Sequence, residues 1–356
     1  MTLETLGWND FFILQPEAIK NNNLKPARVT GVRKNAFIIS DGQKETLVTL
    51  SGSMFHEAQS SGLFPVTGDW VLLKDTLIIS VLNRQNSLSR GASGTKGTNS
   101  DGAVKEQVIA ANIDIVFIVC GLDRDFNLRR IERYLTLVYN SGASPVIVLT
   151  KSDLHETPED FVETTESIAF GIPVYLVSSI EQTGLDKLKV HLQPGRTVAM
   201  IGSSGVGKST LLNHLAGKQL REVKDVSERV GKGVHTTTSR DLFILPDGGM
   251  IIDNPGIREI AFWDNDDGIE SSFPDIKKLS EECRFSDCSH MHEPGCAVTH
   301  AVDKGTIDQG RFNSYIKMKR ELDYLNERQT KSADRIEKER WKDVAVFIKN
   351  KKKTER

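Results

Sequence analysis

The sequence has little of what marks several large classes of protein. Only 4 of its 356 residues are cysteine, which argues against a disulfide-stabilised secreted domain. No apolar run approaches membrane-spanning length, the longest lying within residues 113–120, and the start, MTLETLGWNDFF, lacks the regions of a secretory signal. The net charge of −2 excludes a uniformly basic nucleic-acid binder but not local basic surfaces. We expect a cytoplasmic protein of roughly two or three domains, with no membrane contact.

Three regions of the chain differ in pattern. Five short β-segments separated by turns favour a small barrel of the oligonucleotide-binding type; they span residues 27–32, 36–39, 46–50, 70–73 and 77–81. A β-domain without a ligand is the alternative. From residue 108 apolar strands alternate with helices, which predicts a mostly parallel sheet covered on both faces. After residue 264 the chain is polar and irregular and then helical, ending in KNKKKTER.

These patterns predict a multidomain protein. We place a barrel at residues 1–83, a linker loop at 84–107, an α/β domain at 108–264 and a mostly helical module at 265–356. The loop is rich in Ser, Gly, Thr and Asn and is either a linker or a segment that a partner orders. The basic C-terminal end is a solvated tail or an RNA contact.

The run GSSGVGKS at residues 202–209 fits G-x-x-x-x-G-K-[ST] and stands between a strand and a helix. In that context it predicts a loop that binds a nucleoside triphosphate. Lys208 is expected to reach the β- and γ-phosphates, and the Ser209 hydroxyl to hold Mg²⁺. A Gly/Ser-rich turn before a helix is the alternative. The predicted loop residues are Gly202, Ser203, Ser204, Gly205, Val206, Gly207, Lys208, Ser209 and Thr210.

A second phosphate element follows the apolar strand at residues 250–252. Asp253 begins Asp-Asn-Pro-Gly, a D-x-x-G arrangement. The carboxylate of Asp253 is expected to hold Mg²⁺ through water, and the amide of Gly256 to meet the γ-phosphate.

Two further elements point to a guanine base. Thr150, Lys151 and Asp153 form a [N/T]-K-x-D element at the end of a strand, where the Asp153 carboxylate would accept from the ring N–H and the amine of guanine. Ser178 and Ser179, at the end of the next strand, would complete the base pocket. A strand end capped by Thr and Asp is the alternative reading.

The order of the elements is unusual. The base-reading elements at 150 and 178 precede the phosphate loop at 202 and the D-x-x-G at 253, whereas ordinary small GTPases begin with the phosphate loop. Chain termini within a domain often lie close together, so the same sheet can be built with its entry point moved. The sequence predicts a circularly permuted GTPase.

The segment between the two phosphate elements reads GKGVHTTT, residues 231–238. One of its three threonines is expected to coordinate Mg²⁺. We assign Thr237 as that ligand, although the sequence does not distinguish the three. Ile257 stands where many GTPases have a Gln that orients water. Either intrinsic hydrolysis is very slow or another group acts, and His235 is our candidate, with a structural turn histidine as the alternative.

Three cysteines and one histidine crowd together near the C-terminal end. Cys283, Cys288, His290 and Cys296 form a Cys₃His set suited to a structural zinc ion, because the segment has too few apolar residues to order itself by burial. His292 and His300 are rival ligands. Cys120 lies far upstream and is interpreted as a buried thiol.

These features together resemble the bacterial ribosome small-subunit-dependent GTPase A family. The likeness rests on the barrel–GTPase–zinc arrangement and on the stretches GDWV (68–71), QVIAANID (107–114), GSSGVGKST, HTTT and DNPG. It implies a protein that binds the 30S subunit late in assembly, contacts 16S rRNA through barrel and zinc module, and hydrolyses GTP when the subunit stimulates it. We expect a monomer, because nothing in the sequence suggests an obligate partner chain. The family histidine that matches His235 has been considered for catalysis. Thr150 and Val234 depart from the common Asn and Arg.

Two other functions stay open from the sequence. An RNA-binding scaffold with a regulatory nucleotide and negligible turnover is favoured by Ile257. An ATP-dependent kinase or ATPase is disfavoured by the element at residues 150–153, because adenine lacks the donor pair that Asp153 would accept.

Overall fold

The structure is a computed structural model that describes residues 1–20, 23–91, 106–220, 241–253, 267–291 and 293–330. The chain forms two compact units, of which the first comprises Met1–Leu88 and Val108–Arg258 and the second Ser89–Gln107 and Glu259–Arg356. Among the described helices, none is long and apolar enough to cross a membrane. The domain boundaries expected at residues 83, 107 and 264 stay predictions.

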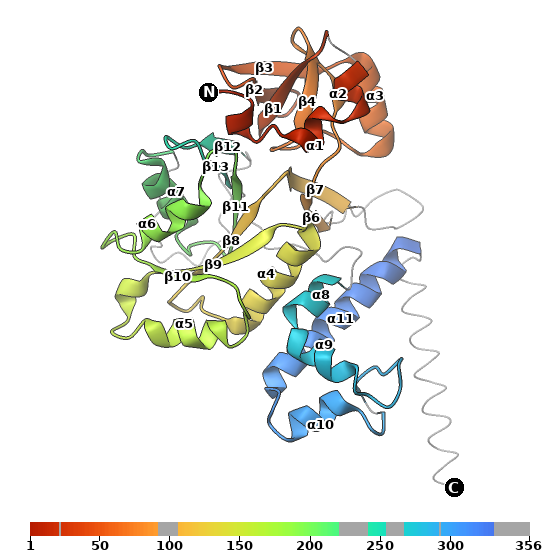
Figure 1. Cartoon of the computed structure of the whole chain (residues 1–356), viewed down its shortest axis with the longest axis vertical. Coiled ribbons are helices and arrows are strands. Elements are labelled where there is room, and N and C mark those ends of the chain that lie inside the picture. Colours follow the sequence, from red (N-terminus) through yellow and green to blue (C-terminus); the bar gives the residue numbers. More distant parts are fainter. Residues whose placement is uncertain (21–22, 92–105, 221–240, 254–266, 292, 331–356) are drawn as a thin grey trace, which may run out of the picture. The chain divides into compact units, whose positions relative to one another are not determined.

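Five strands close into a barrel within the first unit (Figure 1). They are β1 (Lys25–Val32), β2 (Phe37–Ser40), β3 (Glu45–Leu50), β4 (Trp70–Lys74) and β5 (Leu77–Val81). They pair in the order β1–β2–β3–β5–β4, and β4 also pairs with β1, which closes the barrel. Helix α3 (Gly52–Ser61) connects β3 to β4 and begins where the Ser51 hydroxyl accepts from the Met54 amide. The barrel predicted from the sequence is confirmed.

The barrel encloses an apolar core and carries a short N-terminal segment. The core residues alternate along the strands, as a half-buried sheet requires; they are Ala27, Val29, Phe37, Ile39, Val48, Val71, Leu73 and Ile78. The segment forms η1 (Glu4–Leu6), α1 (Asp10–Ile13) and α2 (Pro16–Lys20). Trp8 packs edge-to-face against Trp70 of β4 and Phe12 packs against it at a tilt, with ring centroids 4.7 Å and 5.8 Å away. Aromatic contact therefore attaches the N-terminal segment to the barrel.

A second part of the first unit is built on parallel strands. These are β8 (Ile115–Gly121), β9 (Ser144–Thr150), β10 (Val174–Val177), β11 (Thr197–Ile201) and β13 (Met250–Asp253), with β12 (Asp241–Ile244) antiparallel at one side. Their spatial order is β10-β9-β8-β11-β13-β12. Residues of β8, β9, β11 and β13 are almost wholly buried, which explains their continuous apolar runs. The predicted parallel α/β sheet is confirmed.

Helices connect the parallel strands. They are α4 (Leu128–Ser141), α5 (Glu159–Glu166), α6 (Leu185–Leu188) and α7 (Lys208–Ala216), with the short turns η2 (Ser152–Leu154) and η3 (Lys189–His191). Helix α4 contacts β8 and β9, α5 and α6 contact β10, and α7 contacts β13 (Figure 1). Asn127 caps α4 by accepting from the Arg130 amide. The cap fixes where this helix begins, next to the end of β8.

The barrel and the parallel sheet share one hydrogen-bonded sheet of 11 strands. The link is an antiparallel pairing of β1 with β12, in which Gly31 lies opposite Asp241. The side chain of Arg33 pairs with Asp241 at 2.7 Å beside that link. This continuity between the two regions was not predicted from the sequence.

Arg28 is buried at the junction, with 1% of the residue exposed. Its guanidinium donates to the carbonyl oxygens of Leu6, of Gly68 (3.3 Å) and of Asn112 (2.9 Å), and it lies over the ring of Trp70. Burial lowers its pKa to about 10, against the opposing effects of Asp114 and Asp69, so it remains charged at neutral pH. A single cation thus ties the N-terminal segment, the barrel and the start of the α/β region.

The same guanidinium reaches β13, because its Nη1 lies 3.4 Å from the sulfur of Met250. Close backbone approach reinforces the junction. Gly68 has a φ of +94°, and a Cβ there would lie 2.1 Å from the carbonyl oxygen of Ala111. The Asn112 amide donates to the Gly68 carbonyl at 3.0 Å. The stretches GDWV and QVIAANID therefore meet at the junction, and packing explains their composition.

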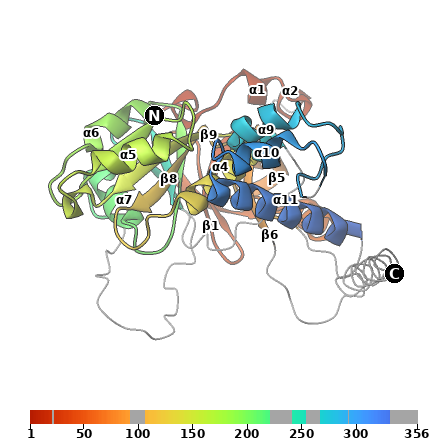
Figure 2. The same cartoon turned by 90° about the horizontal axis from the view of Figure 1, so that it is seen from below.

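The second unit is mostly helical. It contains α8 (Asp267–Ser272), α9 (Pro274–Ser280), α10 (Ala297–Asp303) and the long α11 (Gln309–Thr330) (Figure 1). Helix α9 contacts α8 and α10, and α9, α10 and α11 can be followed from another side in Figure 2. Arg311 of α11 donates to both oxygens of Asp275 at 2.7 and 2.8 Å and lies over the ring of Phe273. A bidentate ion pair and an apolar core hold α11 to α8 and α9. The predicted helical module is confirmed.

The expected linker loop contains two strands at its ends. These are β6 (Ser87–Gly91) and β7 (Glu106–Ala111), which pair in a two-stranded sheet. Arg84, at the start of the loop, donates to both carboxylate oxygens of buried Asp69 at 2.8 Å. The rest of the loop lies outside the described residues.

The junction yields a stability prediction. Replacing Arg28 by methionine removes its donors from the carbonyl oxygens of Leu6, Gly68 and Asn112, of which that of Gly68 still accepts from the Asn112 amide. With two buried carbonyl oxygens losing this donor, we expect Arg28→Met to lower the free energy of unfolding by about 2–6 kcal/mol. The control is Arg33→Met, which removes an ion pair from an arginine side chain that is 40% exposed and should cost under about 1 kcal/mol. Urea unfolding of both variants measures the difference. Equal costs would show that Arg28 does not hold the junction.

Candidate nucleotide and metal sites

The predicted nucleotide elements lie at one edge of the parallel sheet. In the strand register Thr150 lies opposite Gly121 and Val177, and Asp253 lies opposite Met200. The phosphate loop leaves the same edge directly after β11. Ligands of open α/β sheets bind beyond the carboxyl ends of the strands, so this edge is the candidate nucleotide site.

The phosphate loop passes very close to β8. Gly202 has a φ of +147°, and a Cβ there would lie 2.2 Å from the carbonyl oxygen of Val119. Only glycine fits this approach. The loop then turns into α7, which begins at Lys208 and contains Ser209 and Thr210, both half-buried. The loop therefore directs a helix N-terminus at the sheet edge, as anion binding requires.

Lys208 folds over its own loop. Its ammonium donates to the carbonyl oxygens of Gly202 at 2.7 Å and Ser203 at 2.5 Å. Burial lowers its pKa to about 8, while the nearby carboxylates of Asp253 and Asp125 act in the opposite direction. The lysine is thus placed where a triphosphate would meet it, at the cost of burying a charge.

Thr150 attaches the phosphate loop to the end of β9. Its hydroxyl donates to the carbonyl oxygen of Val206 at 2.6 Å and lies 3.3 Å from that of Cys120. The Thr150 hydroxyl thus bonds the phosphate loop. Thr150 stands where the family that the sequence resembles commonly has Asn. Cys120 itself is buried, and burial raises the pKa of its thiol to about 11, in keeping with an inert core residue.

The structure brings together the residues predicted to read the base. The Ser178 hydroxyl donates to Asp153 at 2.5 Å and also accepts from the Glu181 amide at 3.1 Å. Lys151 has the left-handed φ of +60°, and its ammonium pairs with Asp123 at 2.5 Å. A non-glycine residue held in this conformation at a strand end is often functional. Ser179 follows Ser178 and is half-buried.

Some of the predicted site residues fall outside the described part of the chain. Asp253 lies within it, at the end of β13, and is 5% exposed. Gly256 and Ile257 after it do not, nor do His235 and Thr237 of the segment between the phosphate elements. Their roles stay predictions.

A cation that was not predicted from the sequence lies beside the phosphate loop. Arg130, in the first turn of α4, donates to the Ser203 hydroxyl at 2.8 Å and pairs with Asp125. Neither Arg130 nor Asp125 belongs to a sequence motif that would predict its role. Only the position of α4 after a strand that ends at the same sheet edge could have suggested that its first turn reaches the loop.

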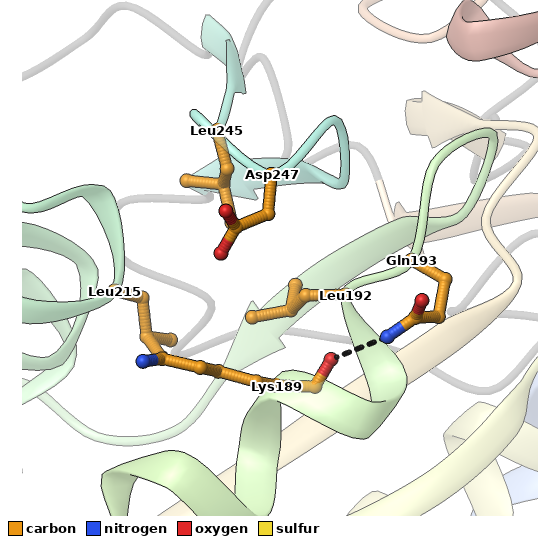
Figure 3. Close-up of a pocket in the computed structure, with 6 residues that line it drawn as sticks. All are labelled: Lys189, Leu192, Gln193, Leu215, Leu245 and Asp247. Atoms are coloured by element: carbon orange, nitrogen blue, oxygen red, sulfur yellow. Dashed lines mark hydrogen bonds between the residues drawn. The ribbon is translucent and has the colours of Figure 1, made fainter.

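A cavity of about 160 Å³ lies elsewhere (Figure 3). It is lined by Lys189, Leu192, Gln193, Leu215, Leu245 and Asp247. Leu245 and Asp247 belong to the turn between β12 and β13, which precedes the first residue of β13. The cavity therefore lies at the end of the strands opposite the phosphate loop, and it is not the nucleotide site.

The Cys₃His set gathers into a cluster in the second unit. The ligand atoms of Cys283, Cys288, His290 and Cys296 all lie within 4.8 Å of one another. Nδ1 of His290 lies 3.4 Å from the Cys296 sulfur and 3.6 Å from that of Cys283, and these two sulfurs are 3.9 Å apart. A tetrahedral metal with bonds of about 2.3 Å to sulfur needs such spacings. The cluster can bind a metal.

The rival ligands differ in outcome. His300 lies on α10 and is not one of the clustered residues, while His292 lies outside the described residues. All four cysteines of the chain are free, so no disulfide competes with a metal for the thiols.

Comparison with known proteins agrees with this geometry. A family model described as RsgA GTPase matches residues 81–263, just over half of the chain. A protein of Opitutus terrae named small ribosomal subunit biogenesis GTPase RsgA is 42% identical over 97% of this chain and 96% of its own. This chain belongs to the RsgA GTPase family. It is a GTP-hydrolysing enzyme by that membership.

Solved structures add the permutation to the family assignment. The crystal structure of YjeQ from Thermotoga maritima is 27% identical, has a TM-score of 0.60, and covers 84% of this chain and 98% of its own. YloQ, titled a circularly permuted GTPase, shares the fold with a TM-score of 0.57 at 24% identity, over 87% of this chain and 96% of its own. A model described as 50S ribosome-binding GTPase matches residues 197–333. That match starts at β11, where an unpermuted GTPase begins.

Lys208 gives a prediction with a defined pH dependence. Its folded pKa of about 8 lies below the unfolded value, so between about pH 8 and 10 the unfolded chain binds more protons and stability rises with pH. We expect Lys208→Met to abolish GTP binding yet to be more stable than the nucleotide-free wild type at pH 7, by about 1–3 kcal/mol. The gap should shrink by pH 9.5. Urea unfolding at both pH values checks this, and a gap that does not change with pH would contradict it.

Proposed function

We propose that this GTPase acts in assembly of the small ribosomal subunit and that the subunit stimulates its hydrolysis of GTP. The observation that carries the proposal is the near-complete match to relatives named for that process, joined to a phosphate loop and base-reading residues at one sheet edge. Because a protein that acts on ribosomal subunits must meet them where they are assembled, we propose that it is cytoplasmic. We infer that it acts as a monomer, with the domain boundaries given above.

Guanine specificity is assigned to Asp153. Its carboxylate already accepts from the Ser178 hydroxyl, which orients it at the sheet edge. The free oxygen positions suit the two N–H groups that guanine presents and adenine does not. The stem of Lys151, fixed by the pair with Asp123, would cover the face of the base. Ser179 would supply a backbone contact.

The phosphates are assigned to the loop and to Asp253. Residues 202–207 offer backbone amides, and Lys208 would move from its carbonyl partners to the β- and γ-phosphates. Mg²⁺ fits a donor set of hydroxyl and carboxylate oxygens, which Ser209 and buried Asp253 supply, with Thr237 as the proposed third ligand. The ion would neutralise charge on the phosphates. Catalysis is then positioning and charge stabilisation.

Water activation is assigned to His235, because Ile257 cannot orient a water molecule. The first experiment measures GTP turnover by the purified protein, alone and with 30S subunits, beside Lys208→Ala. We expect strong stimulation by 30S for the wild type and none for Lys208→Ala. In the same assay His235→Ala should still bind GTP and lose turnover. Binding to 30S without stimulation would favour the scaffold function, and normal turnover by His235→Ala would remove that residue from the mechanism.

We propose that the barrel and the metal module contact 16S rRNA and that the metal is zinc. Three thiolates and an imidazole are the donor set that structural zinc prefers, and the spacings fit it.

We expect one zinc per chain in the purified protein by elemental analysis. Chelation should unfold the segment around residues 283–296, since that segment has little apolar core of its own. GTP binding by the first unit should persist and serves as the internal control. A chain that folds fully with no bound metal would contradict the assignment.

A further inference from the structure

We propose that Arg130 is a positioning residue for the phosphate loop: it holds Ser203 and neutralises Asp125, so that the loop can accept a triphosphate. The proposal rests on the nucleotide site assigned above and adds to it a cation that no motif contains.

Two cations converge on one residue of the loop. Arg130 donates through Nη1 to the Ser203 hydroxyl at 2.8 Å, and Lys208 donates to the Ser203 carbonyl at 2.5 Å. Tyr134 lies close enough to Ser203 for that side chain to oppose the rise in the pKa of Tyr134 that burial causes. Arg130 and Tyr134 are four residues apart and therefore share one face of α4. This face of the helix fixes the first half of the phosphate loop.

Asp125 makes the charge of Arg130 necessary. Its carboxylate pairs with Arg130 and is only 19% exposed. It also lies close enough to Lys208 to oppose the lowering of that lysine's pKa by burial. A carboxylate so near the phosphate loop would repel a triphosphate if it were not neutralised. The Arg130 side chain remains 36% exposed, and its guanidinium contacts the phosphate loop at Ser203. The pair presents no net negative charge to the nucleotide.

Two other cations near the site form ion pairs with other carboxylates. Lys151 pairs with Asp123, and Arg129, the neighbour of Arg130 on α4, pairs with Glu132 at 2.6 Å. Arg129 thus offers a control of the same residue type, charge and helix turn, whose ion pair is with Glu132 of its own helix. It lies outside the proposed binding machinery.

The test measures nucleotide affinity and turnover with fluorescent GTP and GDP analogues and with GTP. We expect Arg130→Ala to raise the dissociation constant and KM for GTP by about tenfold. kcat should change by less than about twofold, because the loop holds phosphates equally in the ground and transition states. Arg129→Ala should bind GTP as the wild type does, while its loss of the pair with buried Glu132 lowers the free energy of unfolding. Ser203→Ala, which keeps the Arg130–Asp125 pair, should weaken GTP binding by a smaller factor.

Charge rescue separates this role from damage to the fold. In the Arg130→Ala background, Asp125→Asn removes the uncompensated carboxylate and should restore most of the lost affinity. Unchanged affinity in Arg130→Ala, or no rescue by Asp125→Asn, would overturn the proposal. Urea unfolding confirms that each variant is folded; if Arg130→Ala is not, the rescue is tested on Arg130→Gln. Failure of the wild type to bind GTP would instead refute the nucleotide site itself.

Discussion

Parallel pairing of β8, β9, β10, β11 and β13 is the constraint on which the nucleotide site depends. Strands that run the same way end at the same edge of the sheet. The last residues of these strands, among them Gly121, Thr150 and Asp253, therefore lie at one edge whatever the order of the strands along the chain. This is why a permuted chain can build the same site. The order of the chain decides only which loops connect the strands. The loops that carry functional residues come directly after the carboxyl ends of the strands.

The buried guanidinium of Arg28 makes the barrel part of the enzyme's architecture. It joins the N-terminal segment, the barrel and the strand that ends in Asp253, and the β1–β12 pairing continues the sheet across the junction. A buried charge is stable only when its donors are satisfied, and here the acceptors come from three separate segments. The barrel is therefore bonded directly to the strands that border the candidate nucleotide site.

Different forces order the two units. The first has a continuous apolar core, in which β8, β9, β11 and β13 are nearly wholly buried. In the second, helices pack around Phe273 and Ile276, but the segment holding the cysteines consists of turns with exposed residues between them. A bound metal can order that segment, as burial of apolar side chains orders the first unit.

Sequence alone determined the parts whose chemistry is local. The phosphate loop, the Cys₃His set and the apolar strands need particular residue types at fixed spacings, so their patterns predicted the barrel, the permuted GTPase core and the metal cluster. Only the tertiary structure decided the Arg28 junction, the Thr150 hydrogen bond to the phosphate loop and the Arg130–Ser203 contact. Each joins residues tens to hundreds of positions apart. No spacing encodes such contacts, because they depend on where strands and helices end in space.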